Sequence, residues 1–353
     1  MRDGEPCDVC LARDAMEPYL HLSLSGVLEA WVARCTACGF RQVRPRLGEE
    51  GLGRLYPDAY FDSRSGIGFA DYARGQQRNK REAFFLAARL RRLAPRGRLL
   101  DVGCALGFLL DAVRGYSGWE VCGIDVSPFA ASFARRKYGL DVSAATLEGA
   151  RFPDDSFDFV IQKDLLEHVL RPREHLRETY RITKPGGRVL IVTPNGEANL
   201  RPIEAQAAEI ASSTGGMLPV LDQGHLSFFR RQHLQRLFRE CGFEIEEFRS
   251  ISVRRGLRAL GFLPRKRGRL KRVPTRASPL ETPAAPAAPA VSGLPGEGDL
   301  YVRMEQEISQ HRSPIRGSRL YYLFRHAMEE LDSLPGSIPL GYDYRVTLRR
   351  PGA

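Results

Sequence analysis

The chain has 353 residues, of which 43% are apolar, so it is long enough for a full globular core and an appended module. The net charge is +11, but ten Lys or Arg and no acid fall within residues 251–276, which leaves the rest near +1. No stretch approaches the roughly 18 uncharged apolar residues of a membrane-spanning helix. The acidic N-terminus also does not look like a signal peptide. We therefore expect a cytoplasmic protein without integral membrane association.

Two Cys-x-x-Cys pairs open the chain, with 24 residues between them: Cys7 with Cys10, and Cys35 with Cys38. Four thiolates at this spacing suit tetrahedral Zn²⁺, and Gly39 permits the tight turn after the second pair. Disulfides are the alternative, which a reducing cytoplasm disfavours. The pattern predicts a structural zinc module over residues 1–48.

An aromatic connector follows at residues 49–78. Its Tyr56, Tyr60 and Phe61 suit either a lid over a ligand pocket or a clamp between two domains. A lead-in helix is predicted at residues 79–93 from its helical apolar spacing.

Strand and helix patterns then alternate as far as residue 263. Strands are predicted at residues 98–102, 119–124, 157–161, 188–193 and 243–250, and helices at 128–138 and 173–182. This alternation predicts an α/β fold with a Rossmann-like, doubly wound, mostly parallel sheet of seven strands, whose main part is residues 79–263.

The composition changes at residues 264–298 to Pro, Ala, Gly and Arg, which cannot form a packed core. We predict a disordered, basic linker inserted there. Residues 299–353 are expected to complete the domain with a helix at 319–331 and a last strand at 343–349.

The first strand of the sheet runs into a glycine turn, Asp101-Val-Gly103-Cys-Ala-Leu-Gly107. Gly103 and Gly107 let a ligand approach the backbone where a Cβ would block it. Asp125 ends the next strand, 22 residues after Gly103, where a carboxylate can bind both hydroxyls of a ribose. A methyl group at Ala105 is expected to fit if its backbone keeps a negative φ.

This turn, with Asp101 before a Gly-x-x-x-Gly spacing, resembles the class I S-adenosylmethionine (SAM)-dependent methyltransferases. The resemblance continues through Phe152-Pro-Asp-Asp-Ser-Phe-Asp, Leu166-Glu-His-Val, Lys184-Pro-Gly-Gly, Thr193-Pro-Asn, His225-Leu-Ser-Phe-Phe and Cys241-Gly-Phe. It looks like the broad family of ubiquinone-pathway O-methyltransferases and sugar methyltransferases. The cysteine segment is similar to the one that precedes the methyltransferase domain in bacterial sugar C-methyltransferases, but their longer C-terminal domain is not recognisable.

The resemblance implies where SAM would bind. Asp101 and Gly103 would border its methionyl end, Asp125 would hold the ribose, Leu147 would lie against the adenine, and Gln162 and Lys163 would lie beneath the sulfonium. The full set of implied cofactor contacts is Asp101, Gly103, Cys104, Ala105, Gly107, Asp125, Val126, Leu147, Gln162 and Lys163.

Methyl transfer requires an aligned acceptor and, when that acceptor is protonated, a base. His168, with Glu167, follows the fourth strand and is one candidate base, because imidazole takes protons near neutral pH. His225 is a second. The alternative is that these histidines only pack or cap their surroundings. His175 and His233 lie within predicted helices and are expected to be solvated surface residues or packing residues.

These observations predict a methyltransferase acting on a hydroxyl, or less readily a carbon, of a small biosynthetic intermediate such as a sugar. The alternatives are an RNA methyltransferase that binds phosphates with residues 254–276, and a non-catalytic SAM-binding scaffold whose basic linker contacts an anionic membrane or another protein. The position after strand four reads Gln162-Lys163-Asp164-Leu165 and lacks the Pro-Pro motif of many base N-methyltransferases. A solvated spacer is the simpler interpretation of the basic segment.

Overall fold

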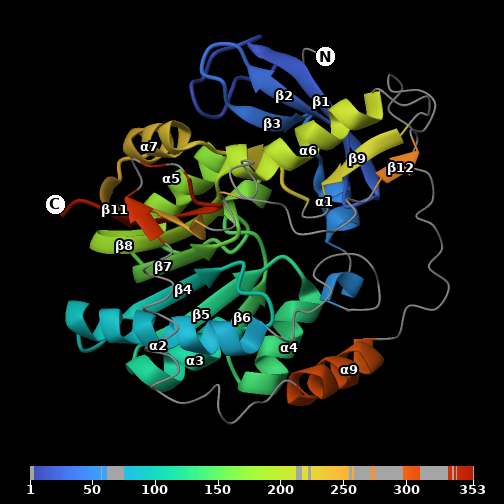
Figure 1. Ribbon diagram of the computed structural model, residues 1–353. Coiled ribbons are helices and arrows are strands. Elements are labelled where there is room, and N and C mark those ends of the chain that lie inside the picture. Colours follow the sequence, from blue (N-terminus) through green and yellow to red (C-terminus); the bar gives the residue numbers. More distant parts are fainter. Residues whose placement is uncertain are drawn as a thin grey trace.

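The computed structural model describes residues 4–56, 58–61, 75–211, 217–221, 224–253, 257, 272–274, 297–310, 333–335, 338 and 340–352. Two β-sheets dominate this part of the chain (Figure 1). A sheet of eight strands forms the body, and a sheet of six strands lies at the end that holds the N-terminus. None of the helices described here is long and apolar enough to cross a bilayer.

The body is a mixed sheet in the order β13-β11-β14-β8-β7-β4-β5-β6. Strands β8, β7, β4, β5 and β6 are parallel, whereas β14 lies antiparallel between β8 and β11. The strands are β4 (Arg98–Val102), β5 (Glu120–Asp125), β6 (Asp141–Ala144), β7 (Phe157–Lys163), β8 (Thr183–Pro194), β11 (Glu244–Ile251), β13 (Ser333–Pro335) and β14 (Asp343–Arg349). The Rossmann-like α/β prediction is confirmed, and the short edge strand β13 brings the predicted seven strands to eight.

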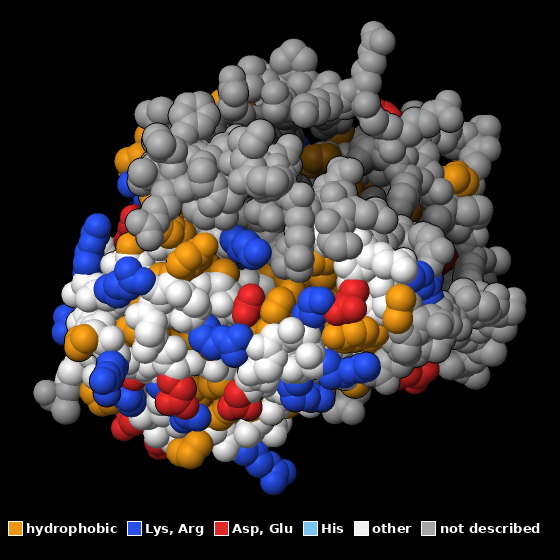
Figure 2. Space-filling model, turned by 90° about the horizontal axis from the view of Figure 1, so that it is seen from below, with side chains coloured by type: hydrophobic (Ala, Val, Ile, Leu, Met, Phe, Trp, Pro, Cys, Tyr) orange, Lys and Arg blue, Asp and Glu red, His pale blue; other side chains and the backbone are white. Residues whose placement is uncertain are grey.

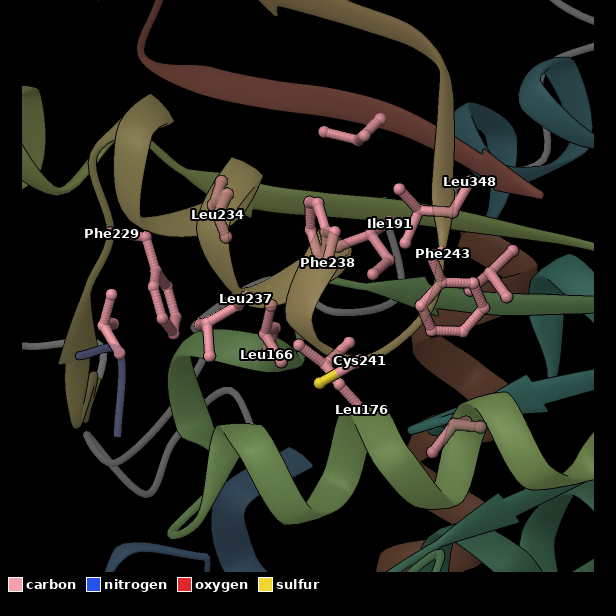
Figure 3. Packing of buried hydrophobic residues seen from close by; sticks show 14 of the residues in the cluster. Leu166, Leu176, Ile191, Phe229, Leu234, Leu237, Phe238, Cys241, Phe243 and Leu348 are labelled. Carbon is pink, nitrogen blue, oxygen red and sulfur yellow. The ribbon is translucent and has the colours of Figure 1, made fainter. Parts of the chain in front are cut away.

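Helices cover both faces of this sheet because its strands are apolar on both sides. Leu99 packs with α2 (Gly75–Leu93) and α3 (Phe108–Ser117), while the next residue, Leu100, faces the opposite cluster. That second cluster lies under α5 (Pro172–Ile182) and α7 (Arg231–Glu240), as Figure 3 shows for Leu176, Leu234 and Ile191. The fold thus has three layers, and the loops at the carboxyl ends of the strands are free to form a site.

The helix α4 (Pro128–Tyr138) begins and ends where its sequence dictates. The Ser127 hydroxyl accepts the backbone N–H of Ala130 at 3.2 Å, and Pro128 occupies the first turn, as expected for a helix start. Gly139 ends the helix with a left-handed φ of +60°, the usual conformation of a glycine after a helix. α9 (Glu297–Gln310) packs on α4 through Leu300, Met304 and Ile308.

The six-stranded sheet combines the cysteine segment with distant parts of the chain. Its order is β10-β3-β2-β1-β9-β12. Its strands are β1 (Met16–Leu24), β2 (Leu28–Cys35), β3 (Arg41–Arg44), β9 (Met217–Leu221), β10 (Ser227–Phe228) and β12 (Arg272–Pro274). Leu200 and Ile203 of α6 (Gly196–Ala211) pack against the apolar face of β1. We call these strands, the cysteine-bearing loops before β1 and between β2 and β3, and α6 the cap.

Buried polar contacts and an aromatic stack join the cap to the body. Arg173 of α5 donates from Nε to the backbone oxygen of Asp8 at 2.7 Å and from Nη2 to that of Val9 at 2.6 Å. Phe40, in the turn after the second cysteine pair, stacks on Phe229 with 5.3 Å between ring centroids. The cap is therefore fastened over the same face of the sheet that carries α5 and α7.

Part of the predicted domain division lies outside the described residues. This applies to the helix expected at residues 319–331 and to most of the basic segment 254–276. Within the expected linker, residues 272–274 form β12 and pair with β9. The connector contains α1 (Glu49–Leu55) and the single-turn helix η1 (Asp58–Phe61), and the predicted last strand is β14.

Candidate active site

The glycine turn between β4 and α3 has left-handed backbone at three positions. Gly103 and Gly107 have φ values of +75° and +77°, and Ala105 has +48°. Our expectation of a negative φ at Ala105 is therefore wrong, because the turn needs a left-handed residue there too, at some cost for an alanine. A Cβ on Gly107 would lie 2.8 Å from Leu140 and 3.0 Å from Ala134, so this glycine also permits close packing of α3 on α4.

Asp125 closes this turn at the end of β5. Its carboxylate accepts the backbone N–H of Ala105 at 2.8 Å and that of Ser127 at 2.9 Å. Burial raises the pKa of Asp125, and these two N–H groups oppose that rise. Val126, the next residue, leaves 55% of its surface exposed. A fixed acidic group beside an open apolar side chain suits a ribose with its attached base.

Asp101 and Lys163 stand at the ends of neighbouring strands. Burial raises the pKa of Asp101 to about 7, an effect that Lys163 opposes. Lys163 donates to Glu82 at 2.5 Å and to Asn79 at 3.2 Å on α2. This charge network lies on the α2 side of the sheet.

Three other predicted cofactor contacts are buried in the body. Gln162 is fully buried and donates to Thr179 of α5 at 2.7 Å, so its side chain is directed toward that helix layer. Leu147 belongs to the same apolar cluster, and Cys104 packs on the α3 side with Gly123. Cys104, Cys122 and Cys241 are buried free thiols.

A second polar cluster forms just after β7, on the single-turn helix η3 (Leu166–His168). Glu167 is buried, with Oε2 accepting the Thr193 hydroxyl of β8 at 2.9 Å. Its Oε1 has no hydrogen-bond partner among the described residues. That atom lies 3.8 Å from Nε2 of His168 and 4.0 Å from Nε2 of His225. Glu167, His168 and His225 thus converge, and we call them the acceptor cluster.

In both histidines, Nδ1 forms a hydrogen bond to a residue of another segment. Tyr56, after α1, shares a hydrogen bond with Nδ1 of His168, and Asn199 of α6 accepts from Nδ1 of His225 at 2.9 Å. The two imidazole rings meet edge to face at 4.8 Å. Burial lowers the pKa of His168 to about 4. At neutral pH His168 is therefore an uncharged imidazole.

The two tyrosines of the connector lie between the glycine turn and the acceptor cluster. Tyr56 and Tyr60 contact each other at 5.3 Å between ring centroids. Burial raises the pKa of both hydroxyls, and the carboxylates of Asp125 and Glu167 raise it further. Asp125 belongs to the glycine turn and Glu167 to the acceptor cluster, so the tyrosines adjoin both of these parts of the site.

Reasoning from the sequence missed two of the supporting residues. Thr193 stands in a motif that carried the family resemblance, yet nothing in that motif indicated a bond to Glu167. Asn199 lies in a helix without a recognisable motif, so no sequence signal pointed to it. His175 and His233 are buried packing residues, with Nδ1 of His175 at 3.3 Å from Glu148 and Nε2 of His233 at 3.1 Å from the backbone oxygen of Cys38.

The four N-terminal cysteines come together as predicted. Sγ of Cys7 lies 3.7 Å from that of Cys38, and Sγ of Cys10 lies 3.6 Å from that of Cys35. Zn–S bonds of about 2.3 Å give tetrahedral S···S edges of about 3.8 Å, so the spacing fits Zn²⁺. Gly39 has a φ of +74° in the second turn, as its tight turn requires.

The acceptor cluster fits a metal less well. Its donor atoms lie within 4.8 Å of one another, but the contacts of 3.8 and 4.0 Å to Oε1 exceed the edge of about 3.4 Å expected around a closed zinc site with nitrogen and oxygen ligands. The wider spacing is better suited to a substrate group between the side chains.

The doubly wound sheet, the glycine turn and the acid that ends β5 define a Rossmann-like protein with a nucleoside cofactor. A family model described as a methyltransferase domain matches residues 74–247. The ubiquinone biosynthesis O-methyltransferase of Thiobacillus denitrificans is 32% identical over 162 residues, covering 44% of this chain and 68% of that protein. The 24-methylenesterol C-methyltransferase 2 of Oryza sativa subsp. japonica is 36% identical over 100 residues, covering 26% and 28%.

Among solved structures, an S-adenosylmethionine-dependent methyltransferase from Mesorhizobium loti aligns with 17% identity and a TM-score of 0.41, covering 74% of this chain and 96% of that one. The chain spans 57% of the related mitochondrial ubiquinone enzyme of Schizosaccharomyces pombe. By the family match and the Thiobacillus relative, this chain belongs to the class I SAM-dependent methyltransferases. SAM is accordingly its methyl donor.

Proposed function

We propose that this protein transfers the methyl group of SAM to a hydroxyl of a small biosynthetic intermediate, with sugars among the candidates. The observation that carries the proposal is the acceptor cluster, since Oε1 of Glu167 and Nε2 of two histidines converge beside the connector tyrosines. A hydroxyl needs such a proton acceptor when it attacks a sulfonium methyl group. The names of the O-methylating ubiquinone enzymes support this assignment, whereas the sterol relative keeps carbon as the second choice.

In this proposal the residues around the glycine turn bind SAM. Asp125 binds the ribose, Val126 and Leu147 border the adenine, and Asp101 binds the methionyl amine. Backbone groups from Gly103 to Gly107, including those of Cys104 and Ala105, line the cofactor. Lys163 tunes the charge on Asp101, and Gln162 contributes backbone only, because its side chain is bonded to Thr179.

The acceptor cluster performs the proton transfer. His168 or His225 takes the proton of the acceptor hydroxyl, and Glu167 stabilises the resulting imidazolium. Burial raises the pKa of Glu167 well above its usual range, with a further contribution from Asp164. A positive charge on either neighbouring imidazole would favour the ionised form of Glu167.

We also propose that Cys7, Cys10, Cys35 and Cys38 hold a structural zinc ion. Their sulfur spacing and their burial against Phe40 and Val9 support this. Four protein ligands leave no open position for a substrate. The metal would therefore stabilise the cap and take no part in methyl transfer.

An RNA substrate is the less supported alternative. On the face shown in Figure 2, Lys and Arg are interspersed with Asp and Glu. A nucleic-acid surface instead concentrates positive charge. The basic segment on which an RNA site or a membrane-bound scaffold would depend lies mostly outside the described residues.

The test combines cofactor binding with product identification. Titration calorimetry with S-adenosylhomocysteine and zinc quantification on the same sample come first, followed by labelled SAM with panels of hydroxylated sugars and phenols. A methyl ether product is expected. Replacing both His168 and His225 by Gln should reduce turnover by about 100-fold or more without changing S-adenosylhomocysteine affinity. His21→Gln, at a partly exposed position of β1, is the matched control.

Two outcomes would overturn the hydroxyl assignment. The first is a product methylated on carbon or nitrogen. The second is full turnover in the double histidine variant, which would place the chemistry elsewhere.

A further inference from the structure

The two histidines of the acceptor cluster differ in what their second ring nitrogen contacts. Nδ1 of His168 meets the hydroxyl of Tyr56, which is able to donate or to accept. Nδ1 of His225 meets Oδ1 of Asn199 at 2.9 Å, and an amide oxygen only accepts. The bond to Asn199 therefore selects the Nδ1–H tautomer of His225. His168 is set by a different contact, because its ring also hydrogen-bonds to the backbone of Gly224.

Asn199 makes further contacts besides the one to His225. Nδ2 donates to the Tyr342 hydroxyl at 3.1 Å, and the backbone N–H of Asn199 donates to the Asn195 oxygen at 2.9 Å. Asn195 is fixed in turn, because its Nδ2 donates to the Gly341 oxygen at 3.0 Å. The segment before β14 thus contacts the far end of the amide, and Oδ1 of Asn199 faces His225 in this arrangement.

With its proton on Nδ1, neutral His225 has the proton-accepting lone pair on Nε2. This is the nitrogen that faces Oε1 of Glu167 at 4.0 Å. The backbone next to His225 is held on both sides. The N–H of Leu226 donates to the backbone oxygen of Glu167, and the N–H of Val43 donates to the backbone oxygen of Leu226, both at 2.8 Å. Cap strand β3 and helix η3 therefore fix the position of the ring, and Asn199 fixes its protonation.

We propose that Asn199 is a positioning residue for methyl transfer, which holds His225 in the Nδ1–H tautomer so that Nε2 accepts the proton of the acceptor. In the reaction, the hydroxyl proton moves to Nε2 while the oxygen forms a bond to the methyl carbon and the C–S bond breaks. S-adenosylhomocysteine leaves as a neutral thioether, and the imidazolium returns its proton to solvent. This inference rests on the proposed hydroxyl methylation and assigns the base within it.

The first measurement requires no acceptor. Long-range ¹H–¹⁵N NMR spectra of histidine-labelled protein report which ring nitrogen carries the proton, and His225→Gln identifies the signals of His225. We expect the Nδ1–H form in the wild-type protein. The Nε2–H form would overturn the proposal, since it means that the amide of Asn199 is turned the other way.

Two substitutions at Asn199 then separate positioning from packing. Asn199→Leu keeps the approximate shape of the side chain but removes the oxygen that accepts the hydrogen bond of Nδ1. His225 should therefore shift toward Nε2–H and kcat should fall about 100-fold, with the KM for SAM unchanged. Asn199→Asp keeps an oxygen for Nδ1–H and should restore kcat to within about 10-fold of wild type. Thermal unfolding checks that each variant is folded.

Two results at this stage would contradict the positioning role. One is an Asn199→Leu protein that loses turnover while His225 stays in the Nδ1–H form. The other is an Asn199→Asp protein that is as inactive as the Leu variant. Should the product prove not to be a methyl ether, the proposed function fails, while the NMR spectra still report whether Asn199 sets the tautomer.

Discussion

The two halves of the candidate active site are built in different ways. The cofactor half lies mostly within residues 98–127, where a strand, a glycine turn and a second strand follow one another and Asp125 bonds back to the turn. The acceptor half brings together Tyr56, Glu167, His168, Asn199 and His225, from the connector, the body and the cap. In the proposed function, a local motif therefore binds SAM, whereas segments that meet only in the tertiary structure bind the methyl acceptor.

The cap explains how segments far apart in the sequence are held next to one another in the acceptor half. Its sheet includes β1, β2 and β3 of the cysteine segment together with β9, β10 and β12 from beyond α6. Because β3 pairs with β10, Gln42 lies opposite Ser227, two residues after His225. The strand pairing that connects the cysteine segment to β10 therefore also positions His225.

The largest expected effect tests this dependence on the cap. Removing zinc with a chelator, or replacing a ligand as in Cys10→Ser, should destabilise the cap by several kcal/mol, since structural zinc sites contribute about 10 kcal/mol or more to small domains. Methyl transfer should be lost. S-adenosylhomocysteine should still bind within about threefold of wild type, because a change of this size is only about 0.7 kcal/mol. Calorimetry measures the binding of S-adenosylhomocysteine, and zinc quantification measures the removal of the metal.

Cys241→Ser is the matched control for this experiment. Cys241 is a buried thiol near the Arg173 backbone and far in sequence from the cysteine pairs. Its replacement should leave the zinc content at one ion per chain. An equal loss of cofactor binding and turnover on zinc removal would show that the two halves do not separate.

The opposite experiment affects the cofactor half alone. Asp125→Ala removes the group expected to bind the ribose and the acceptor for the N–H groups of Ala105 and Ser127. Charge-assisted hydrogen bonds contribute about 1.5–3 kcal/mol each. The affinity for S-adenosylhomocysteine should therefore fall about 100-fold or more in calorimetry, while the NMR signals of His225 keep their wild-type tautomer.

Asp141→Ala, at the exposed start of β6, is the corresponding control and should bind normally. Asp125→Asn adds a finer comparison, because it keeps one oxygen for the turn. Unchanged affinity in Asp125→Ala would disprove the ribose assignment.

The same contrast explains what the sequence could predict. Apolar runs and glycines are local signals, so β4, α4 and β14 were predicted at the observed residues. The cysteine pairs were equally readable because spacing alone defines a tetrahedral site. Asn199 and the pairing of β3 with β10 depend on which segments meet in space, and neither leaves a periodic pattern. Ala105 shows a further limit, since its left-handed φ follows from the geometry of the turn.

The smallest predicted effect concerns the pH dependence of stability. It tests whether water is excluded from the acceptor half, as the burial of its residues indicates. Burial lowers the pKa of His168 to about 4, against about 6.5 in an unfolded chain. The unfolded state therefore binds more protons between these values, and stability is lost as pH falls through them. Between pH 7.5 and 5 the wild type should lose about 2 kcal/mol more than His168→Gln, measured by urea unfolding. His21, which is partly exposed, should give a smaller change in the same direction. Equal losses in wild type and His168→Gln would mean that water reaches His168. The hydroxyl of the methyl acceptor would then compete with water for the base at the centre of the site.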